Sequence, residues 1–282
     1  MKIAVLGTSC IDRVILARNG LVNFQTTTQV TETDSFGGSM HNVAYHLGVL
    51  GLDCHFISKF GNDDLSKAII NDLKTNGVTC HSVIVDAPCP IFTCIQDIQK
   101  KMYLSSVDSR YFFDEKDQID SIILNDIDYG ITDNNNPIFL KSLLDANKKI
   151  KWILNARQID YSLMKNLEGY ILNREEAKRY EPELNQDEFA KKCLEAGLKW
   201  IVITMDKDGL CFYNQDTKQH FSSLTGGQGV TLGCGDAFST GMLYGLSKKL
   251  SPLDSVIYGL KASAIIYKLP SATSKKIVKI KI

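Results

Sequence analysis

Apolar residues in this chain are grouped in two ways that alternate from the N-terminus to the C-terminus. Short runs of mainly apolar residues, such as 2–6 and 200–204, are typical of strands that are buried on both faces of a sheet. Other segments repeat an apolar residue every three or four positions, as Leu65, Ile69 and Leu73 do, which predicts a helix with one buried face. Strands and helices that alternate in this way indicate a doubly wound α/β fold, with a mostly parallel sheet flanked by helices.

The same patterns predict the position of each element. Buried strands are expected at 2–6, 54–58, 127–131, 151–154, 169–172 and 200–204, with a hairpin over 210–223. Helices are expected at 43–50, 65–73, 138–147, 174–180, 187–196 and 238–246. A last helix is expected to begin at 251–254, where Ser251 can cap the first turn and Pro252 suits its first position.

Two segments depart from this alternation. Residues 13–36 and 91–107 mix β-branched and polar residues without a helical period, which predicts exposed strands. We interpret them as a small β lid attached to the α/β core. The remaining pattern contains no repeat or linker, so we expect residues 1–282 to form one domain.

Composition and charge exclude several classes of protein. The 32 basic and 32 acidic residues cancel, so nothing in the charge favours nucleic acid or an anionic membrane as a partner. No apolar run is long enough to cross a membrane, and the first one is too short for a signal peptide. The eight cysteines form no C-x-x-C pair, which argues against a zinc site or a disulfide framework. These features predict a cytoplasmic protein with reduced thiols.

A glycine-rich stretch, 225–236, runs directly into the predicted helix at 238–246. The first turn of a helix has unpaired N–H groups and a partial positive charge, so the amides of Gly233 to Gly235 would suit a phosphate or a developing oxyanion. Asp236 could then take a proton from an attacking hydroxyl, with its pKa held low by the helix terminus. The alternative is a plain glycine turn in which Asp236 caps the helix.

A second glycine turn, Phe36-Gly37-Gly38-Ser39, precedes the predicted helix at 43–50. Asn42 follows it, and an amide side chain can both donate to and accept from the hydroxyls of a sugar-like ligand.

Asp12 follows the first strand, at the edge where open α/β sheets bind ligands. It could meet ligand hydroxyls there, or simply hydrogen-bond a turn. The G-x-G-x-x-G pattern of dinucleotide-binding proteins is missing at this strand end, which argues against a nicotinamide enzyme.

Taken together, these motifs resemble the signatures of the ribokinase-like, or PfkB, family of carbohydrate and nucleoside kinases. Gly37-Gly38-x-x-x-Asn42 is similar to its first signature, and Gly233-Cys234-Gly235-Asp236 is similar to its second. Asn173-Arg174-Glu175-Glu176 resembles the family's N-x-x-E motif, and Asp12 lies where members grip sugar hydroxyls. The resemblance covers essentially the whole chain.

The resemblance implies an ATP-dependent kinase that phosphorylates a hydroxyl of a sugar or nucleoside. It implies that Asp236 is the catalytic base and that Gly233, Cys234 and Gly235 form the anion hole. The acceptor would be bound by Asp12, Gly37, Gly38, Ser39, Asn42 and Asp236. ATP would be bound by Asn173, Thr204, Asp206, Gly209, Thr231, Gly233 and Gly235, with Mg²⁺ held near Glu176 through water.

Three positions depart from the family pattern. Val230 stands where many members have an aspartate of a monovalent-cation site, which counts against potassium activation. Asp206 replaces a glycine near the nucleotide phosphates, where its charge should weaken ATP binding. Asn155-Ala156 replaces a frequent Asp-Pro pair. These changes keep open a second interpretation, a catalytically weak homologue that binds sugars or nucleotides as a regulator.

The sequence also suggests which acceptor is phosphorylated and how many chains associate. Residues 132–137, together with 262–264 and 271–273, are similar to pseudouridine kinases of the family, although a polar turn and a small-residue helix explain them equally well. The unpaired edges of the β lid could join two chains, so we expect a homodimer.

Overall fold

In the computed structural model, the described residues are 1–18, 22, 26–97, 101–155, 160–226 and 229–281. Nine strands of this part form one sheet, in the order β13-β12-β11-β10-β9-β8-β1-β4-β5. Neighbouring strands are parallel from β11 through β10, β9, β8, β1 and β4 to β5. At the other edge, β12 pairs with β11 and β13 pairs with β12 in antiparallel fashion. The strands are β1 (Lys2–Leu6), β4 (Asp53–Phe60), β5 (Val78–Ile84), β8 (Tyr129–Thr132), β9 (Lys151–Leu154), β10 (Gly169–Asn173), β11 (Trp200–Thr204), β12 (Leu210–Asn214) and β13 (Lys218–Phe221).

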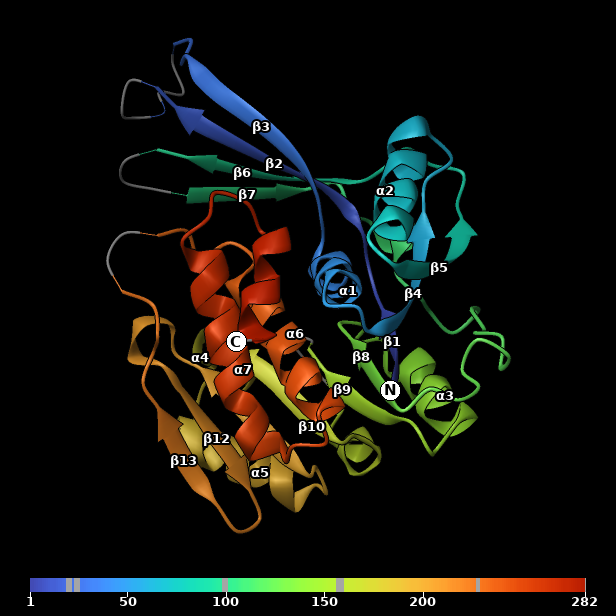
Figure 1. The fold of residues 1–282 in the computed structure, drawn as a ribbon, viewed down its shortest axis with the longest axis vertical. Coiled ribbons are helices and arrows are strands. Elements are labelled where there is room, and N and C mark those ends of the chain that lie inside the picture. The colour runs from blue at the N-terminus through green and yellow to red at the C-terminus, as the bar shows by residue number, and fades with distance from the viewer. Residues whose placement is uncertain (19–21, 23–25, 98–100, 156–159, 227–228, 282) are drawn as a thin grey trace.

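Helices cover both faces of this sheet. The helices are α1 (Ser39–Val49), α2 (Asp64–Thr75), α3 (Pro137–Ala146), α4 (Arg174–Tyr180), α5 (Gln186–Glu195), α6 (Cys234–Ser247) and α7 (Pro252–Tyr267). Side chains of β1 alternate between the two layers: Ile3 and Val5 pack in the core with α1, α2, α6 and α7, whereas Ala4 and Leu6 pack in the core with α3 and α5. Figure 1 shows α6 and α7 side by side in front of the sheet. The chain therefore has the doubly wound α/β architecture that its alternating pattern predicts.

A second sheet of four strands has the order β3-β2-β6-β7. Its strands are β2 (Cys10–Ala17), β3 (Val30–Gly37), β6 (Ile91–Gln96) and β7 (Lys101–Ser105). It extends away from the main body (Figure 1). The segments predicted as exposed strands supply most of it, although 19–21, 23–25 and 98–100 lie outside the described residues. We call it the small sheet.

Most predicted elements are present within one or two residues of their expected bounds, and Ser251 caps α7 by accepting a hydrogen bond from the Asp254 amide. Strand β5 is an exception, because the sequence analysis predicted no strand at residues 78–84. It is an edge strand whose last residues are exposed, so no apolar run marks it. Strand β8 begins at Tyr129 rather than Ile127, after Asp126 has turned the chain with a φ of 60°.

Candidate active site

The two glycine turns meet at one carboxylate. Helix α1 begins after Gly38 and helix α6 begins after Gly233. The Ser39 hydroxyl donates to Oδ1 of Asp236 at 2.5 Å, and the Asn42 amide donates to Oδ2 at 2.8 Å. Both oxygens of Asp236 are therefore oriented by side chains of the other helix.

The first glycine turn has no room for side chains at positions 37 and 38, because neighbouring atoms lie too close. A Cβ atom on Gly37 would lie 2.0 Å from Oδ2 of Asp12. Gly38 has a φ of 97°, and a Cβ atom there would lie 2.8 Å from the carbonyl oxygen of Thr8. The turn can pack against Asp12 and the β1–β2 connection only because both residues lack a side chain.

A cavity of about 540 Å³ opens at this point, between the carboxyl ends of the main strands and the small sheet. It contains side chains from both glycine turns, from the small sheet and from the ends of β8 and β9. Its lining is Thr8, Cys10, Asp12, Gly38, Ser39, Asn42, Phe92, Ser105, Val107, Phe112, Asp133, Asn135, Asn155, Glu176, Leu232 and Asp236. The residues predicted to bind the acceptor are thus gathered around one cavity, with Gly37 directly behind Asp12.

Burial raises the pKa of the Asp236 carboxyl, while hydrogen bonds from Asn42 and Ser39 oppose that shift. The expectation that the helix terminus holds this pKa low is therefore wrong. Desolvation of the enclosed carboxylate outweighs the stabilisation from its two donors and the helix terminus. A carboxylate with a raised pKa is a stronger base, which suits it better to accept a proton from an alcohol.

Asp12 is almost fully buried, with 6 % of its surface exposed. The Cys10 thiol lies 3.5 Å from its Oδ1 and donates to it. Burial, together with the nearby charge of Asp236, raises the pKa of Asp12 to about 6 although the Cys10 contact opposes this. Asp12 is therefore mainly ionised at neutral pH, at a cost in folding free energy.

At the start of α6, only part of the predicted anion hole is open to a ligand, because the Cys234 amide is already hydrogen-bonded. Gly233 has a φ of 76°, and a Cβ atom there would collide with Ala272 at 2.6 Å. The Cys234 amide already donates to the Thr231 carbonyl at 3.2 Å, and its thiol faces the carbonyl groups of Val230 and Ser263. A Cβ atom on Gly235, by contrast, would meet nothing within 4 Å. The open space beside this helix end therefore lies next to Gly235.

On the predicted nucleotide side, Asn173 and Glu176 cap helix α4 reciprocally. The Glu176 amide donates to the Asn173 side chain at 2.8 Å, and the Asn173 amide donates to the Glu176 carboxylate at 3.0 Å. Glu176 also lines the cavity, whereas the cavity lining does not include Asn173. The motif therefore has a structural function at the helix end besides any contact with a ligand.

The other predicted nucleotide contacts lie beyond the cavity lining. Thr204 ends β11, and Asp206 and Gly209 form the short turn after it, with φ values of 48° and 87°. Asp206 is exposed. Burial of the Cys234 thiol is the main reason that its pKa is raised to about 11, and the charge of Asp206 contributes to the same shift. Its carboxylate thus acts close to the start of α6. Thr231 is exposed just before that helix.

Val230 offers no side-chain ligand for a cation. Its side chain is apolar and 39 % exposed, and its amide donates to the Tyr267 carbonyl at 2.9 Å. Among the described residues, no group of three or more His, Cys, Asp or Glu side chains comes together as a metal site. Glu176 could hold magnesium only together with phosphate oxygens and water, which is how this ion usually binds.

Ten of the lining residues were not predicted as site residues: Thr8, Cys10, Phe92, Ser105, Val107, Phe112, Asp133, Asn135, Asn155 and Leu232. Asp133 and Asn135 follow β8 and Asn155 follows β9, so the rule that placed Asp12 at a strand end could also have found them. Asn155 donates to the Ser239 hydroxyl of α6 at 3.1 Å. Its neighbour Ala156 lies outside the described residues.

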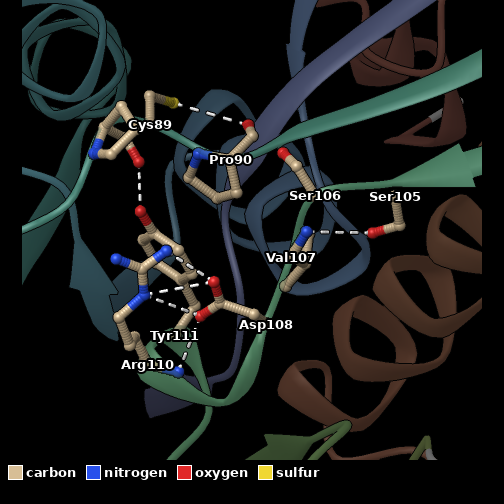
Figure 2. Close-up of a pocket in the computed structure, with 9 residues that line it drawn as sticks. Cys89, Pro90, Ser105, Ser106, Val107, Asp108, Arg110 and Tyr111 are labelled. Carbon is tan, nitrogen blue, oxygen red and sulfur yellow. Dashed lines mark hydrogen bonds and ion pairs between the residues drawn. The ribbon is translucent and has the colours of Figure 1, made fainter.

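A second cavity, of about 370 Å³, lies at the base of the small sheet and shares Ser105 and Val107 with the first. Figure 2 shows the two connections that form it, one through Cys89 and Pro90 and the other from Ser105 to Tyr111. The Tyr111 hydroxyl donates to the Pro88 carbonyl and ties the two connections together. This cavity contains none of the glycine-turn residues, so we regard it as part of the attachment of the small sheet.

Comparison with known proteins agrees with this geometry. The family model described as "pfkB family carbohydrate kinase" matches residues 1–278. The chain belongs to the pfkB family of carbohydrate kinases. As a member, it is a phosphotransferase of a family that uses ATP, and its homologues are sugar and nucleoside kinases.

The pfkB relatives differ in the acceptor that their names specify. The chain is 25 % identical to the ATP-dependent 6-phosphofructokinase of Thermoanaerobacterium thermosaccharolyticum, over 83 % of this chain and 79 % of that protein. It is 24 % identical to the guanosine-inosine kinase of Exiguobacterium acetylicum, over 82 % and 83 %. It is 22 % identical to the ribokinase of Staphylococcus aureus, over 94 % and 92 %. These relatives do not single out the pseudouridine kinases.

Solved structures share the fold. The ribokinase of Thermotoga maritima superposes with a TM-score of 0.82 at 22 % identity, covering 99 % of this chain and 98 % of that one. The ribokinase of Arabidopsis thaliana, complexed with ribose and ATP, has a TM-score of 0.82 at 17 % identity, with the same coverage. The predicted ribokinase-like fold is therefore confirmed. In the part of the chain that the structure describes, no helix combines the length and apolarity needed to cross a membrane.

Proposed function

We propose that this protein transfers the γ-phosphate of ATP to a hydroxyl of a sugar or nucleoside, with Asp236 as the general base. The observation that carries the proposal is the position of Asp236. Its carboxylate lies in the cavity, at the start of α6, and is oriented by Ser39 and Asn42. A base held beside a helix N-terminus combines proton removal with stabilisation of negative charge, as phosphoryl transfer requires.

The acceptor hydroxyl binds between Asp236 and the terminal phosphate of ATP. Asp12 and Asn42 hold the neighbouring hydroxyls, and the glycine pair at 37–38 brings these groups close to the acceptor. The acceptor oxygen forms a bond to the γ-phosphorus, the bond to the bridging oxygen breaks, and ADP leaves with that electron pair. Asp236 takes the proton of the hydroxyl. Because its pKa is raised, the carboxylate is a stronger base for this proton.

The transferring phosphoryl group gains charge beside the first turn of α6. The amides of Gly233 and Gly235 stabilise that charge, and the open space at Gly235 receives the phosphoryl oxygens. Magnesium bound with the triphosphate neutralises part of its charge. Glu176 would hold that ion through water, and Asn173, Thr204, Asp206, Gly209 and Thr231 would contact the nucleotide.

The small sheet serves as the lid of this site. Its strand β2 carries Asp12 and its strand β6 carries Phe92, so its position controls the contacts of the acceptor. Closing it excludes water, which otherwise competes with the acceptor for the phosphoryl group. Its edge strands β3 and β7 offer unpaired backbone groups through which two chains form a homodimer. Sedimentation equilibrium measures that state directly.

All eight cysteines are free thiols. This supports a reducing compartment, and we assign the protein to the cytoplasm.

A non-catalytic regulator is the second candidate. Two observations favour it: Val230 offers no carboxylate, and Asp206 brings negative charge near the start of α6. It predicts that sugars or nucleotides bind without turnover.

Measuring ADP release with Mg-ATP separates the two candidates. The panel of acceptors contains pentoses, hexoses and nucleosides, pseudouridine among them. The kinase predicts ADP formation that depends on the acceptor and is lost in Asp236→Asn. The regulator predicts no ADP with any acceptor, and calorimetric binding that survives the same substitution.

A further inference from the structure

Helix α1 carries two histidines, His41 and His46, whose side chains are both 0 % exposed. A buried imidazole costs free energy where its nitrogens lack hydrogen bonds, and an apolar side chain could fill the same space without that cost. In each ring one nitrogen has a polar contact, and the other has no partner among the described residues. The contact that each ring does make therefore indicates what the histidine is for.

The contact of His46 is structural. Its Nε2 lies 3.2 Å from the backbone amide of Ser274, which can only donate, so Nε2 accepts and the ring carries its proton on Nδ1. Two residues earlier, Ala272 packs against Gly233. His46 thus attaches α1 to the segment that supports the start of α6.

The contact of His41 leads to the active site. Its Nδ1 lies 3.4 Å from Oδ1 of Asn42. The amide nitrogen of Asn42 already donates to Asp236 at 2.8 Å, so the amide oxygen is the atom that faces His41. An amide oxygen has no proton to give, so Nδ1 of His41 carries the proton and donates it. Two hydrogen bonds in series therefore run from His41 through Asn42 to Asp236.

The imidazole of His41 acts without a charge. Burial lowers the pKa of His41 to about 4, although the contact with Asn42 opposes this shift. The ring is therefore neutral at neutral pH, and its single N–H is used by Asn42. Its influence on Asp236 must then pass through the amide that lies between them.

That amide has two orientations, in which its oxygen and its nitrogen exchange places. While Asp236 is ionised it can only accept, so it keeps the nitrogen of Asn42 toward itself. Once Asp236 has taken the proton of the acceptor, it could donate that proton to the oxygen of a rotated amide, and this would stabilise the protonated base. The rotated amide would turn its own N–H toward the N–H of His41, so His41 opposes the rotation.

We propose that His41 is a positioning residue of this kinase: its Nδ1–H holds the Asn42 amide in one orientation, so that a donor faces Asp236 before and after proton transfer. The proposal rests on the proposed function and adds a residue to its mechanism. A donor held against the carboxylate favours the ionised form, so loss of His41 should raise the pKa of Asp236.

The acidic limb of the kcat profile reports the pKa of the base in the substrate complex. His41→Phe keeps a ring and removes the N–H, so this limb should move upward by roughly half to one pH unit, the size expected for one neutral hydrogen bond. His41→Asn places an amide near the position of Nδ1 and should reverse most of the shift, whereas His41→Gln places it near Nε2 and should not. His81→Asn is the control, because His81 lies on the edge strand β5, contacts His55 and does not line the cavity. It should leave the limb unchanged.

The titratable groups around Asp236 and the His41 ring are the same in all position-41 variants. They are Asp12 of β2, Glu176 of α4, Cys234 of α6, and Tyr45 and His46 of α1. Differences among these variants therefore arise at position 41. A double substitution tests the route: in the Asn42→Ala background, His41→Phe should cause no further shift, because the amide that transmits its effect is gone.

Two measurements need no turnover. In protein labelled with ¹⁵N in its five histidines, long-range ¹H–¹⁵N spectra show which ring nitrogen carries the proton. His41 should carry it on Nδ1, and the loss of its signals in His41→Asn assigns them. The carboxyl ¹³C shift of Asp236 should titrate at higher pH in His41→Phe than in the unsubstituted protein.

The outcomes are distinct. A proton on Nε2 of His41 overturns the proposal, and this result needs no variant that folds poorly. An unchanged Asp236 titration in folded His41→Phe, or equal profiles in His41→Asn and His41→Gln, overturns it as well, while the proposed kinase function stands. If no acceptor of the panel yields ADP, the kinase function fails, and the two spectra still show whether His41 holds Asn42 against Asp236.

Discussion

The side-chain amide of Asn42 donates a 2.8 Å hydrogen bond to the carboxylate of Asp236, across a separation of 194 positions in sequence. The bond joins the first turn of α1 to the first turn of α6, so the two glycine-flanked helix ends form a single site. Because Ser39 holds the second oxygen of the same carboxylate, the base has little freedom to rotate.

Replacing Asp236 by asparagine should separate chemistry from binding. The amide keeps the shape of the carboxylate but cannot take a proton, so we expect kcat to fall by roughly two to four orders of magnitude. Binding of the acceptor, measured by calorimetry, should change little. Ser39→Ala is the matched control: it keeps the base and removes one donor that lowers its pKa. It should retain most of kcat and move the acidic limb of the pH profile upward; a loss as large as that of Asp236→Asn would contradict the assignment.

The KM of the acceptor should depend on pH through Asp12. The pKa of this carboxyl is raised to about 6, so the ionised form that accepts hydrogen bonds from hydroxyls is depleted as the pH falls below that value. We expect KM to rise about tenfold for each pH unit well below 6, and to level off above pH 7. Steady-state kinetics from pH 5 to pH 8 measure this. In Asp12→Asn this pH dependence of KM should disappear; its persistence would mean that another group titrates.

The same carboxyl should lower the stability of the free protein. Its pKa is higher in the folded chain than in the unfolded one, so folding is penalised above about pH 6 and the penalty vanishes below the ordinary value near 4. Asp12→Asn should therefore raise the free energy of unfolding at pH 8 by up to about 3 kcal/mol, and have little effect near pH 3.5. Urea unfolding at both pH values measures the difference. An equal effect at the two values would show that charge is not its cause.

The order and chemistry of the motifs could be predicted from sequence because each depends on local backbone demands. Gly37 and Gly38 must lack a side chain to fit against Asp12 and Thr8, and this requirement is visible in the sequence as a glycine pair. The buried strands were also predictable, since each is a short apolar run.

What could not be predicted depends on contacts between distant segments. The raised pKa of Asp236 follows from its burial in the folded chain, whereas a local argument from its helix end gives the opposite sign. The cavity lining is similar: Asp133 and Asn155 follow different strands and become neighbours of the site only when β8 and β9 take their places in the sheet.

The two glycines at the start of α6 should respond differently to alanine. Gly233 has a φ of 76° and a Cβ atom there would lie 2.6 Å from Ala272, so Gly233→Ala should destabilise the protein by roughly 1–3 kcal/mol. A Cβ atom on Gly235 meets nothing within 4 Å, so Gly235→Ala should fold normally. Its methyl group would instead occupy the space proposed for the phosphoryl oxygens, and we expect kcat to fall at least about tenfold. Thermal unfolding and kcat of both variants test this; normal kcat in Gly235→Ala would place the phosphoryl group elsewhere.

Asp206 should have two effects that can be separated, one on the stability of the protein and one on nucleotide binding. Its φ of 48° lies in the left-handed region, where a residue with a Cβ atom is strained by roughly 1 kcal/mol. Its carboxylate also acts near the start of α6, where the phosphates of ATP are proposed to bind. Asp206→Gly removes both the strain and the charge, so it should raise the melting temperature and lower the KM for ATP severalfold. Asp206→Asn removes the charge alone and should lower that KM while leaving the stability nearly unchanged. If neither variant changes the KM for ATP, the carboxylate does not face the nucleotide, and Asp206 no longer counts in favour of a catalytically weak protein.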